Sequence, residues 1–173
     1  TSNLITEEFE KFGLEYSFTK DSKPESFEAE IKENTKVIYI ETPSNPLLTV
    51  TDIKAIAEIA KKHNLVSMID NTFASPVNQN PIDFGIDIVL HSATKYMGGH
   101  SDILAGTAIA SEEHIDKIFQ LAKNFGGNLS DFTVWMLERS LKTMGLRVRA
   151  QNENALELAR FLEKHEDISR VFY

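Results

Sequence analysis

The sequence predicts an α/β fold in which a mostly parallel β-sheet is flanked by helices, and two observations carry this prediction. Short, nearly continuous apolar runs at residues 37–40, 65–69 and 86–90 are typical of strands buried on both faces of a parallel sheet. An amphipathic helical pattern lies between the first two runs, as expected of a right-handed crossover between parallel strands.

The residues before the first run predict two short helices and a short strand. Residues 5–12 have helical apolar spacing, and Gly13 follows where a helix would end. Residues 14–18 alternate in polarity, which predicts a strand. Ser22 before Pro24 predicts the start of the second helix.

Residues 51–63 carry a clear amphipathic helical pattern. Its apolar residues recur at i, i+3, i+4 and i+7, namely Ile53, Ile56, Ala57 and Ala60. Thr51 is the expected N-cap with Asp52 in the first turn, and basic residues at the other end suit the helix dipole.

A further strand and three helices are predicted after the third apolar run. Residues 105–110 predict the strand and residues 112–125 the first helix. Ser130 and Asp131 are expected to cap a second helix, and residues 146–164 to form a third. Residues 168–173 have the pattern of an opening strand.

The composition excludes several classes of protein. The 173 residues carry 18 Lys and Arg against 26 Asp and Glu, and this acidic balance argues against a nucleic-acid binder. No apolar run approaches the roughly 18 residues that cross a bilayer, and no signal peptide is recognisable, so a cytoplasmic protein is expected. Without cysteine, and with five His that lack ligand spacing, a disulfide scaffold, a thiol nucleophile and a metal site are not expected.

Three polar segments follow the three apolar runs, at residues 41–46, 70–73 and 92–95. In open α/β sheets, ligands bind beyond the carboxyl ends of the strands, where these segments would converge. An Asp, an Asn, two hydroxyls and a Lys would then share one crevice. That set suits pyridoxal phosphate, which needs a Lys for covalent attachment and an acid for its ring nitrogen. Taken singly, each residue is more typical of a turn or a solvated surface than of a functional site, and only the convergence of the three segments favours a site.

Other candidate sites have weaker support. Residues 100–102, His-Ser-Asp, contain the residue types of a hydrolase triad, but adjacent residues cannot adopt triad geometry, so a structural loop is favoured. Arg139, Arg147 and Arg149 could bind substrate carboxylates, but salt bridges on helices that border the sheet are the favoured interpretation.

Three runs resemble the Cys/Met-metabolism pyridoxal-phosphate enzymes: ETPSNP at 41–46, IDNTFASP at 69–76 and HSATKYMGGHSD at 91–102. That family includes cystathionine γ-synthase, cystathionine γ- and β-lyases, methionine γ-lyase and the O-acylhomoserine sulfhydrylases. The resemblance covers essentially the whole chain. It implies the large domain of a fold-type I pyridoxal-phosphate-dependent transferase.

The resemblance also implies roles for individual residues. Lys95 is similar to the Schiff-base lysine, which also moves protons between substrate carbons, and Asp70 to the carboxylate that pairs with the pyridinium nitrogen. The other implied cofactor contacts are Asn45 near the ring hydroxyl, Thr72 against the ring, and Ser92 and Thr94 at the phosphate.

The implied activity is β- or γ-elimination, or γ-replacement, on a sulfur amino acid or an activated homoserine. The sequence around residues 98–102 looks most like that of cystathionine γ-synthase or γ-lyase, with methionine γ-lyase or O-acetylhomoserine sulfhydrylase as alternatives. A fold-related aminotransferase is disfavoured, because the Ser-Ala-Thr-Lys-Tyr context differs from that class. The expected partner is a small amino-acid substrate, and the parent is expected to be a homotetramer.

The chain opens with Thr-Ser-Asn and no Met, whereas family members are considerably longer. Residues 1–167 are therefore expected to form a cofactor domain that is incomplete on its N-terminal side, and residues 168–173 to start a C-terminal domain. A second hypothesis is that the chain by itself is an inactive structural fragment.

Overall fold

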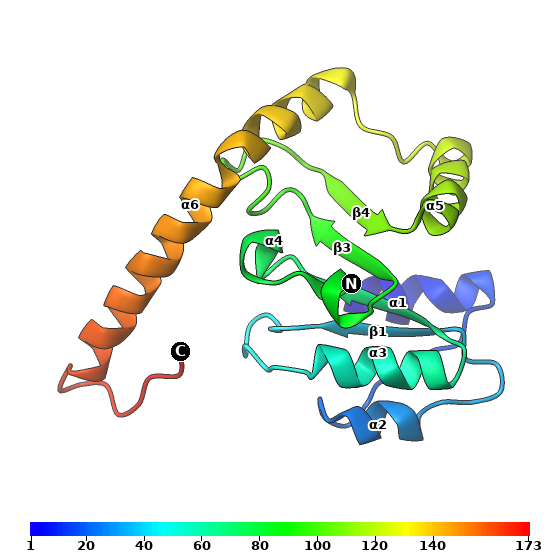
Figure 1. Cartoon of the computed structure of the whole chain (residues 1–173), viewed down its shortest axis with the longest axis horizontal. Coiled ribbons are helices and arrows are strands. Elements are labelled where there is room, and N and C mark those ends of the chain that lie inside the picture. The colour runs from blue at the N-terminus through cyan, green and yellow to red at the C-terminus, as the bar shows by residue number, and fades with distance from the viewer.

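A computed structural model describes all residues from 1 to 173. Its centre is a four-stranded sheet in the order β1 (Val37–Glu41), β2 (Val66–Asp70), β3 (Ile88–Ser92) and β4 (Gly106–Ala110) (Figure 1). Strands β1, β2 and β3 are parallel, and β4 is antiparallel to β3. The predicted mostly parallel sheet is confirmed.

The strand register determines where each strand ends relative to its neighbours. Glu41, the last residue of β1, pairs with Asp70, the last residue of β2. Asp70 in turn pairs with Leu90, so β3 continues for two more residues to Ser92. All three carboxyl ends therefore lie at the same edge of the sheet.

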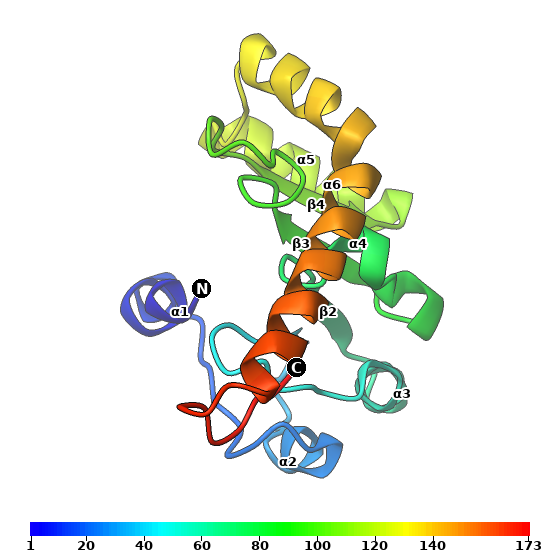
Figure 2. The same cartoon turned by 90° about the vertical axis from the view of Figure 1, so that its left-hand side faces the viewer.

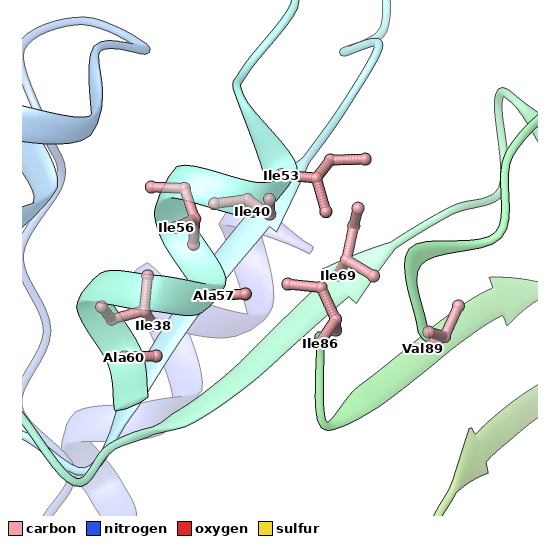
Figure 3. Close-up of a cluster of buried hydrophobic side chains, with 9 residues drawn as sticks. All are labelled: Ile38, Ile40, Ile53, Ile56, Ala57, Ala60, Ile69, Ile86 and Val89. Atoms are coloured by element: carbon pink, nitrogen blue, oxygen red, sulfur yellow. The ribbon is translucent and has the colours of Figure 1, made fainter. Parts of the chain in front are cut away.

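Helix α3 (Ile53–Lys62) covers one face of β1 and β2 with the predicted stripe. Figure 3 shows the resulting core, in which Ile56 and Ile69 are completely buried. The full cluster is Ile38, Ile40, Ile53, Ile56, Ala57, Ala60, Ile69, Ile86 and Val89. Burial of these apolar side chains fixes the sheet that presents the strand ends.

Asp52, not Thr51, caps α3, so that prediction was wrong. The Asp52 carboxylate accepts a hydrogen bond from the Ala55 N–H at 3.0 Å. Thr51 is instead buried, and its N–H donates to the Thr42 Oγ1 at 2.9 Å. This bond ties the start of α3 to the segment that follows β1.

The N-terminal region contains α1 (Ser2–Glu8), the 3-10 helix η1 (Phe9–Phe12) and α2 (Pro24–Ala29). Helices α1 and α3 lie on opposite sides of the sheet (Figure 2). The strand predicted at residues 14–18 was wrong: these residues pair with no strand. Alternating polarity by itself does not create a strand when no sheet edge lies beside it.

Between β2 and β3 the chain forms α4 (Ser75–Asn78) and η2 (Pro81–Phe84). Beyond β4 it forms α5 (Glu112–Phe125), with the predicted bounds. A single 33-residue helix, α6 (Asp131–Glu163), then replaces the two helices predicted there.

The prediction of two helices was wrong because nothing within α6 stops it. Gly145 lies in its middle, but one glycine costs a helix only about 1 kcal/mol relative to alanine. The strand predicted at residues 168–173 was also wrong, since these residues have no pairing partner. No helix of the structure combines the length and the apolar character needed to span a bilayer.

A second apolar cluster joins the β3–β4 connection to the first half of α6. Ala93, Met97, Ile103 and Ala105 of the connection pack against Leu137 of the helix. The connection is thereby fixed against α6, as Figure 1 shows.

Candidate cofactor site

Hydrogen bonds connect the segments that follow β2 and β3. The Asp70 Oδ1 accepts from the Thr72 N–H at 2.9 Å, and the Thr72 Oγ1 accepts from the Ser92 N–H at 2.7 Å. The Lys95 N–H donates to the Ser92 carbonyl at 3.0 Å. The structure therefore brings Asp70, Thr72, Ser92 and Lys95 together at one edge, as the strand order predicts.

Asp70 is half-buried, and its Oδ1 accepts the Thr72 N–H. Its charge acts on the neighbouring strand. Burial raises the pKa of Tyr39 to about 12. A hydrogen bond with Thr1 opposes this shift, whereas the negative charges of Asp70 and Glu41 and a hydrogen bond with Asp70 add to it. The carboxyl ends of β1 and β2 thus carry negative charge, which suits a cationic group such as a protonated ring nitrogen.

Lys95 lies in the connection that follows β3, and its side chain is exposed. Its ammonium forms no salt bridge or hydrogen bond, so the amine is free to react with a carbonyl. Ser92 is half-buried, and its hydroxyl has no partner within the chain. Both side chains therefore keep their binding capacity for a ligand.

Thr94 is engaged with the start of β4. Its hydroxyl donates to the Ala105 carbonyl at 3.2 Å and accepts from the Ala105 N–H at 3.0 Å. These bonds close the connection between β3 and β4. To donate to a phosphate, this hydroxyl would have to give up its bond to the carbonyl, so its phosphate role stays a prediction.

Asn45 lies in the segment after β1 and is exposed. Its N–H donates to the Glu41 Oε1 at 3.0 Å, and its side-chain amide has no partner in the chain. No hydrogen bond links Asn45 to the group formed by Asp70 and Lys95. It belongs to the same edge of the sheet, and its contact with the ring hydroxyl stays a prediction.

Sequence reasoning missed a pair of amide side chains, Asn71 and Gln79, that holds this edge together. The Gln79 Nε2 donates to the Asn71 Oδ1 at 2.7 Å and to the Thr42 carbonyl at 2.9 Å. In return, the Asn71 Nδ2 donates to the Gln79 carbonyl at 2.9 Å. The pair joins the ends of β1 and β2. The only signal in the sequence was the position of Asn71 directly after Asp70.

The prediction of salt bridges for the three arginines was wrong. Arg139 and Arg149 are exposed and form no ion pair. Arg147 instead donates to the carbonyls of Tyr96 and Met97, at 2.8 and 3.3 Å. Its guanidinium therefore holds the backbone directly after Lys95.

Two surface hollows lie elsewhere in the fold. One, of about 390 Å³, is lined by Ile86, Asp87 and Ile109 at the opposite edge of the sheet. The other, of about 510 Å³, lies between Glu10 and Lys32 near the N-terminal helices. Neither contains a Lys and an acid on adjacent strand ends, so neither competes as a site for the same cofactor.

The residues at the strand ends fit pyridoxal phosphate. Its aldehyde requires a free amine, which Lys95 offers, and its ring nitrogen requires a carboxylate, which Asp70 offers at the end of β2. Its phosphate requires hydroxyl or N–H donors, and the Ser92 hydroxyl is unengaged. The donor set thus contains counterparts for the aldehyde, the ring nitrogen and the phosphate of the cofactor.

Comparison with known proteins supports the same cofactor. The sequence profile of the Cys/Met metabolism PLP-dependent enzymes matches residues 1–173. The chain is 44% identical over its whole length to a Bacillus subtilis cystathionine gamma-synthase/O-acetylhomoserine (thiol)-lyase, and 45% identical to a Lactococcus lactis cystathionine beta-lyase. It covers 47% and 46% of these two proteins.

The fold is also similar to solved structures. The cystathionine gamma-lyase of Lactobacillus plantarum, crystallised with L-serine, superposes with a TM-score of 0.95 at 42% identity. The match covers 99% of this chain and 45% of that enzyme. The chain therefore spans about half the length of the relatives that it matches.

Proposed function

Because the chain belongs to the family of Cys/Met metabolism PLP-dependent enzymes, we propose that it forms the core of the cofactor site of such an enzyme. The enzyme would carry out β- or γ-elimination, or γ-replacement, on sulfur amino acids or activated homoserine. The supporting observation is the hydrogen-bonded edge that unites Asp70, Thr72, Ser92 and Lys95.

Lys95 would attach the cofactor and then act on protons. Its amine is exposed and unpaired, so it would hold the cofactor through the aldehyde group. The same amine, tethered beside the substrate, would accept a proton at the α-carbon and deliver one further along the substrate chain. When bound, pyridoxal phosphate supplies an electron sink for the negative charge that develops on the substrate carbon.

Asp70 would keep the ring nitrogen protonated. The Thr72 N–H holds one carboxylate oxygen at 2.9 Å, and the carboxylate would pair with the ring nitrogen at the strand ends. A charge-assisted hydrogen bond of this kind is roughly twice as strong as a neutral one. Asp70 thereby maintains the electron-withdrawing form of the cofactor.

The remaining predicted contacts would position the cofactor. Ser92, with its free hydroxyl, is a donor for the phosphate, and Thr94 would join it after exchanging one hydrogen bond. Thr72 and Asn45 would contact the ring and its hydroxyl. These assignments rest on the similarity of the motifs and on the placement of their segments at one edge.

The substrate class follows the relatives. Those with high identity are named as cystathionine synthases and lyases, and one of them also as an O-acetylhomoserine (thiol)-lyase, which supports chemistry on cystathionine or on an activated homoserine. The discriminating assay uses the full reading frame that contains this chain. Release of 2-oxobutyrate from cystathionine indicates γ-elimination and pyruvate indicates β-elimination, whereas cystathionine formed from an activated homoserine and cysteine indicates γ-replacement.

The cofactor assignment is tested by visible absorbance. The full-length protein is expected to be yellow and to lose its colour on borohydride reduction, because Lys95 would hold the cofactor covalently. Lys95→Ala is expected to abolish the colour and the activity. A reducible band of unchanged strength in the Lys95→Ala variant would sink the assignment.

We also propose that the full-length enzyme is a cytoplasmic homotetramer and that these 173 residues alone are inactive. Helices α5 and α6 leave many large apolar side chains exposed, among them Phe125, Phe132 and Trp135, which supports cover by further protein. The isolated chain is expected to bind pyridoxal phosphate weakly and to release neither pyruvate nor 2-oxobutyrate from cystathionine.

A further inference from the structure

Arg147 of α6 contacts the backbone that follows Lys95. Its Nη1 donates to the Tyr96 carbonyl at 2.8 Å, and its Nη2 donates to the Met97 carbonyl at 3.3 Å. The same guanidinium donates to the Ser140 carbonyl at 3.0 Å and, through Nε, to the Thr143 Oγ1 at 3.1 Å. The arginine is thus anchored on its own helix while it holds the loop.

The loop is shaped to receive this guanidinium. A Cβ placed on Gly99 would lie 1.9 Å from the Arg147 Nη1, and Gly99 has a positive φ of 77°. Gly98 is also constrained, since a Cβ there would lie 2.8 Å from the Ile103 Cγ1 and 2.9 Å from the Ala93 carbonyl oxygen. Arg147 therefore occupies the space that a side chain at residue 99 would need.

These contacts leave the Arg147 guanidinium with few free N–H donors to bind an anion. A guanidinium has five N–H donors, and Arg147 directs its three nitrogens at four oxygen atoms of the chain. A role in binding the substrate carboxylate, considered for this residue from the sequence, is therefore disfavoured. The guanidinium instead binds the loop that follows Lys95 and the carbonyl and hydroxyl oxygens of its own helix.

The backbone of Lys95 is held on both sides. Its N–H donates to the Ser92 carbonyl at 3.0 Å, and its carbonyl accepts from the Gly99 N–H at 2.6 Å. Arg147 fixes the two carbonyls that lie between these points, while Met97 packs against Leu137 of the same helix. The long, exposed Lys95 side chain thus extends from a rigid base.

We propose that Arg147 is a positioning residue for Lys95, which sets the backbone from which the lysine amine reaches the cofactor aldehyde. This inference rests on the proposed function. A displacement of about 1 Å at a reacting group can slow a reaction about a hundredfold. Loss of the guanidinium is therefore expected to impair attachment of the cofactor, although Arg147 touches neither cofactor nor substrate.

The test uses the full-length protein, stripped of cofactor, with wild type, Arg147→Met and Arg147→Lys compared. The rate at which added pyridoxal phosphate restores the visible band is expected to fall ten- to a hundredfold in Arg147→Met. The pH midpoint of that band is also expected to shift, because the amine lies in an altered position. Arg147→Lys keeps one cationic donor and is expected to recover part of the rate.

Arg160→Met is the matched control, since Arg160 lies on α6 with an exposed side chain and no hydrogen bond or ion pair. It is expected to keep the wild-type rate and pH midpoint. A lowered melting temperature in Arg147→Met with an unchanged rate and pH midpoint would overturn the inference, because the arginine would then be only structural. If Arg147→Met does not fold, Arg147→Lys decides by the same two readouts.

Failure of the proposed function has a different signature. If the wild-type protein itself acquires no visible band, the cofactor assignment is overturned, and the positioning role with it. A normal wild-type band together with wild-type behaviour of the folded Arg147 variants overturns the positioning role alone.

Discussion

Asp70 and Tyr39 illustrate how single residues set the electrostatics of the strand ends. Both lie on the same face of neighbouring strands, two residues apart in register. The Asp70 carboxylate discourages ionisation of the Tyr39 phenol, and burial of the phenol acts more strongly in the same direction. The same negative charge that disfavours a phenolate favours a protonated ring nitrogen.

Tyr39 is therefore expected to ionise with a pKa of about 12, against 10.0 for an ordinary tyrosine. Since the folded-state pKa is raised, this residue stabilises the fold fully below pH 10, and that contribution is lost as the pH rises toward 12. Phenolate absorbance measured during an alkaline titration checks this. Tyr39→Phe should remove the late-titrating phenol, and a wild-type protein whose tyrosines all ionise near pH 10 would refute the assignment.

Gln79 illustrates the contribution of a partly buried polar contact at the site. In Gln79→Met, the Asn71 Oδ1 and the Thr42 carbonyl lose their donor, so the free energy of unfolding is expected to fall by about 1–3 kcal/mol. Urea denaturation measures this change. The exposed neighbour Asn80→Ala serves as control; equal stability of both variants would mean that the amide pair contributes nothing.

At the scale of elements, predictions succeeded where one periodic pattern determines the structure. The amphipathic stripe of α3 and the three apolar runs were sufficient for the sheet and its covering helix. Predictions failed where the outcome depends on a neighbour. Residues 14–18 have no neighbouring strand to pair with. Helix α6 continues through Gly145 because a single glycine costs too little to end a helix of this length.

The core under α3 has a measurable consequence. Ile56 is completely buried between the helix and the sheet, so Ile56→Ala is expected to lower the free energy of unfolding by about 2–5 kcal/mol. Lys54→Ala on the exposed side of the same helix is the control, and a change within about 0.5 kcal/mol is expected there. A similar loss in both variants would contradict the assigned packing.

At the scale of the whole molecule, the strand order explains why the site could be predicted from the sequence. Parallel strands in the order β1-β2-β3 put their carboxyl ends at one edge, so residues 70, 72, 92 and 95 meet although they come from separate segments. Arg147 could not be predicted in the same way. It contacts residues about fifty positions earlier, and only the course of α6 past the β3–β4 connection brings them together.

The central claim is that Lys95 carries the cofactor. Its most direct test is borohydride reduction of the full-length protein with pyridoxal phosphate bound, followed by proteolysis and mass spectrometry of the peptides. The phosphopyridoxyl group is predicted on Lys95 alone and in nearly every molecule. Its presence on another lysine, or equal labelling of the Lys95→Ala variant, would contradict the assignment.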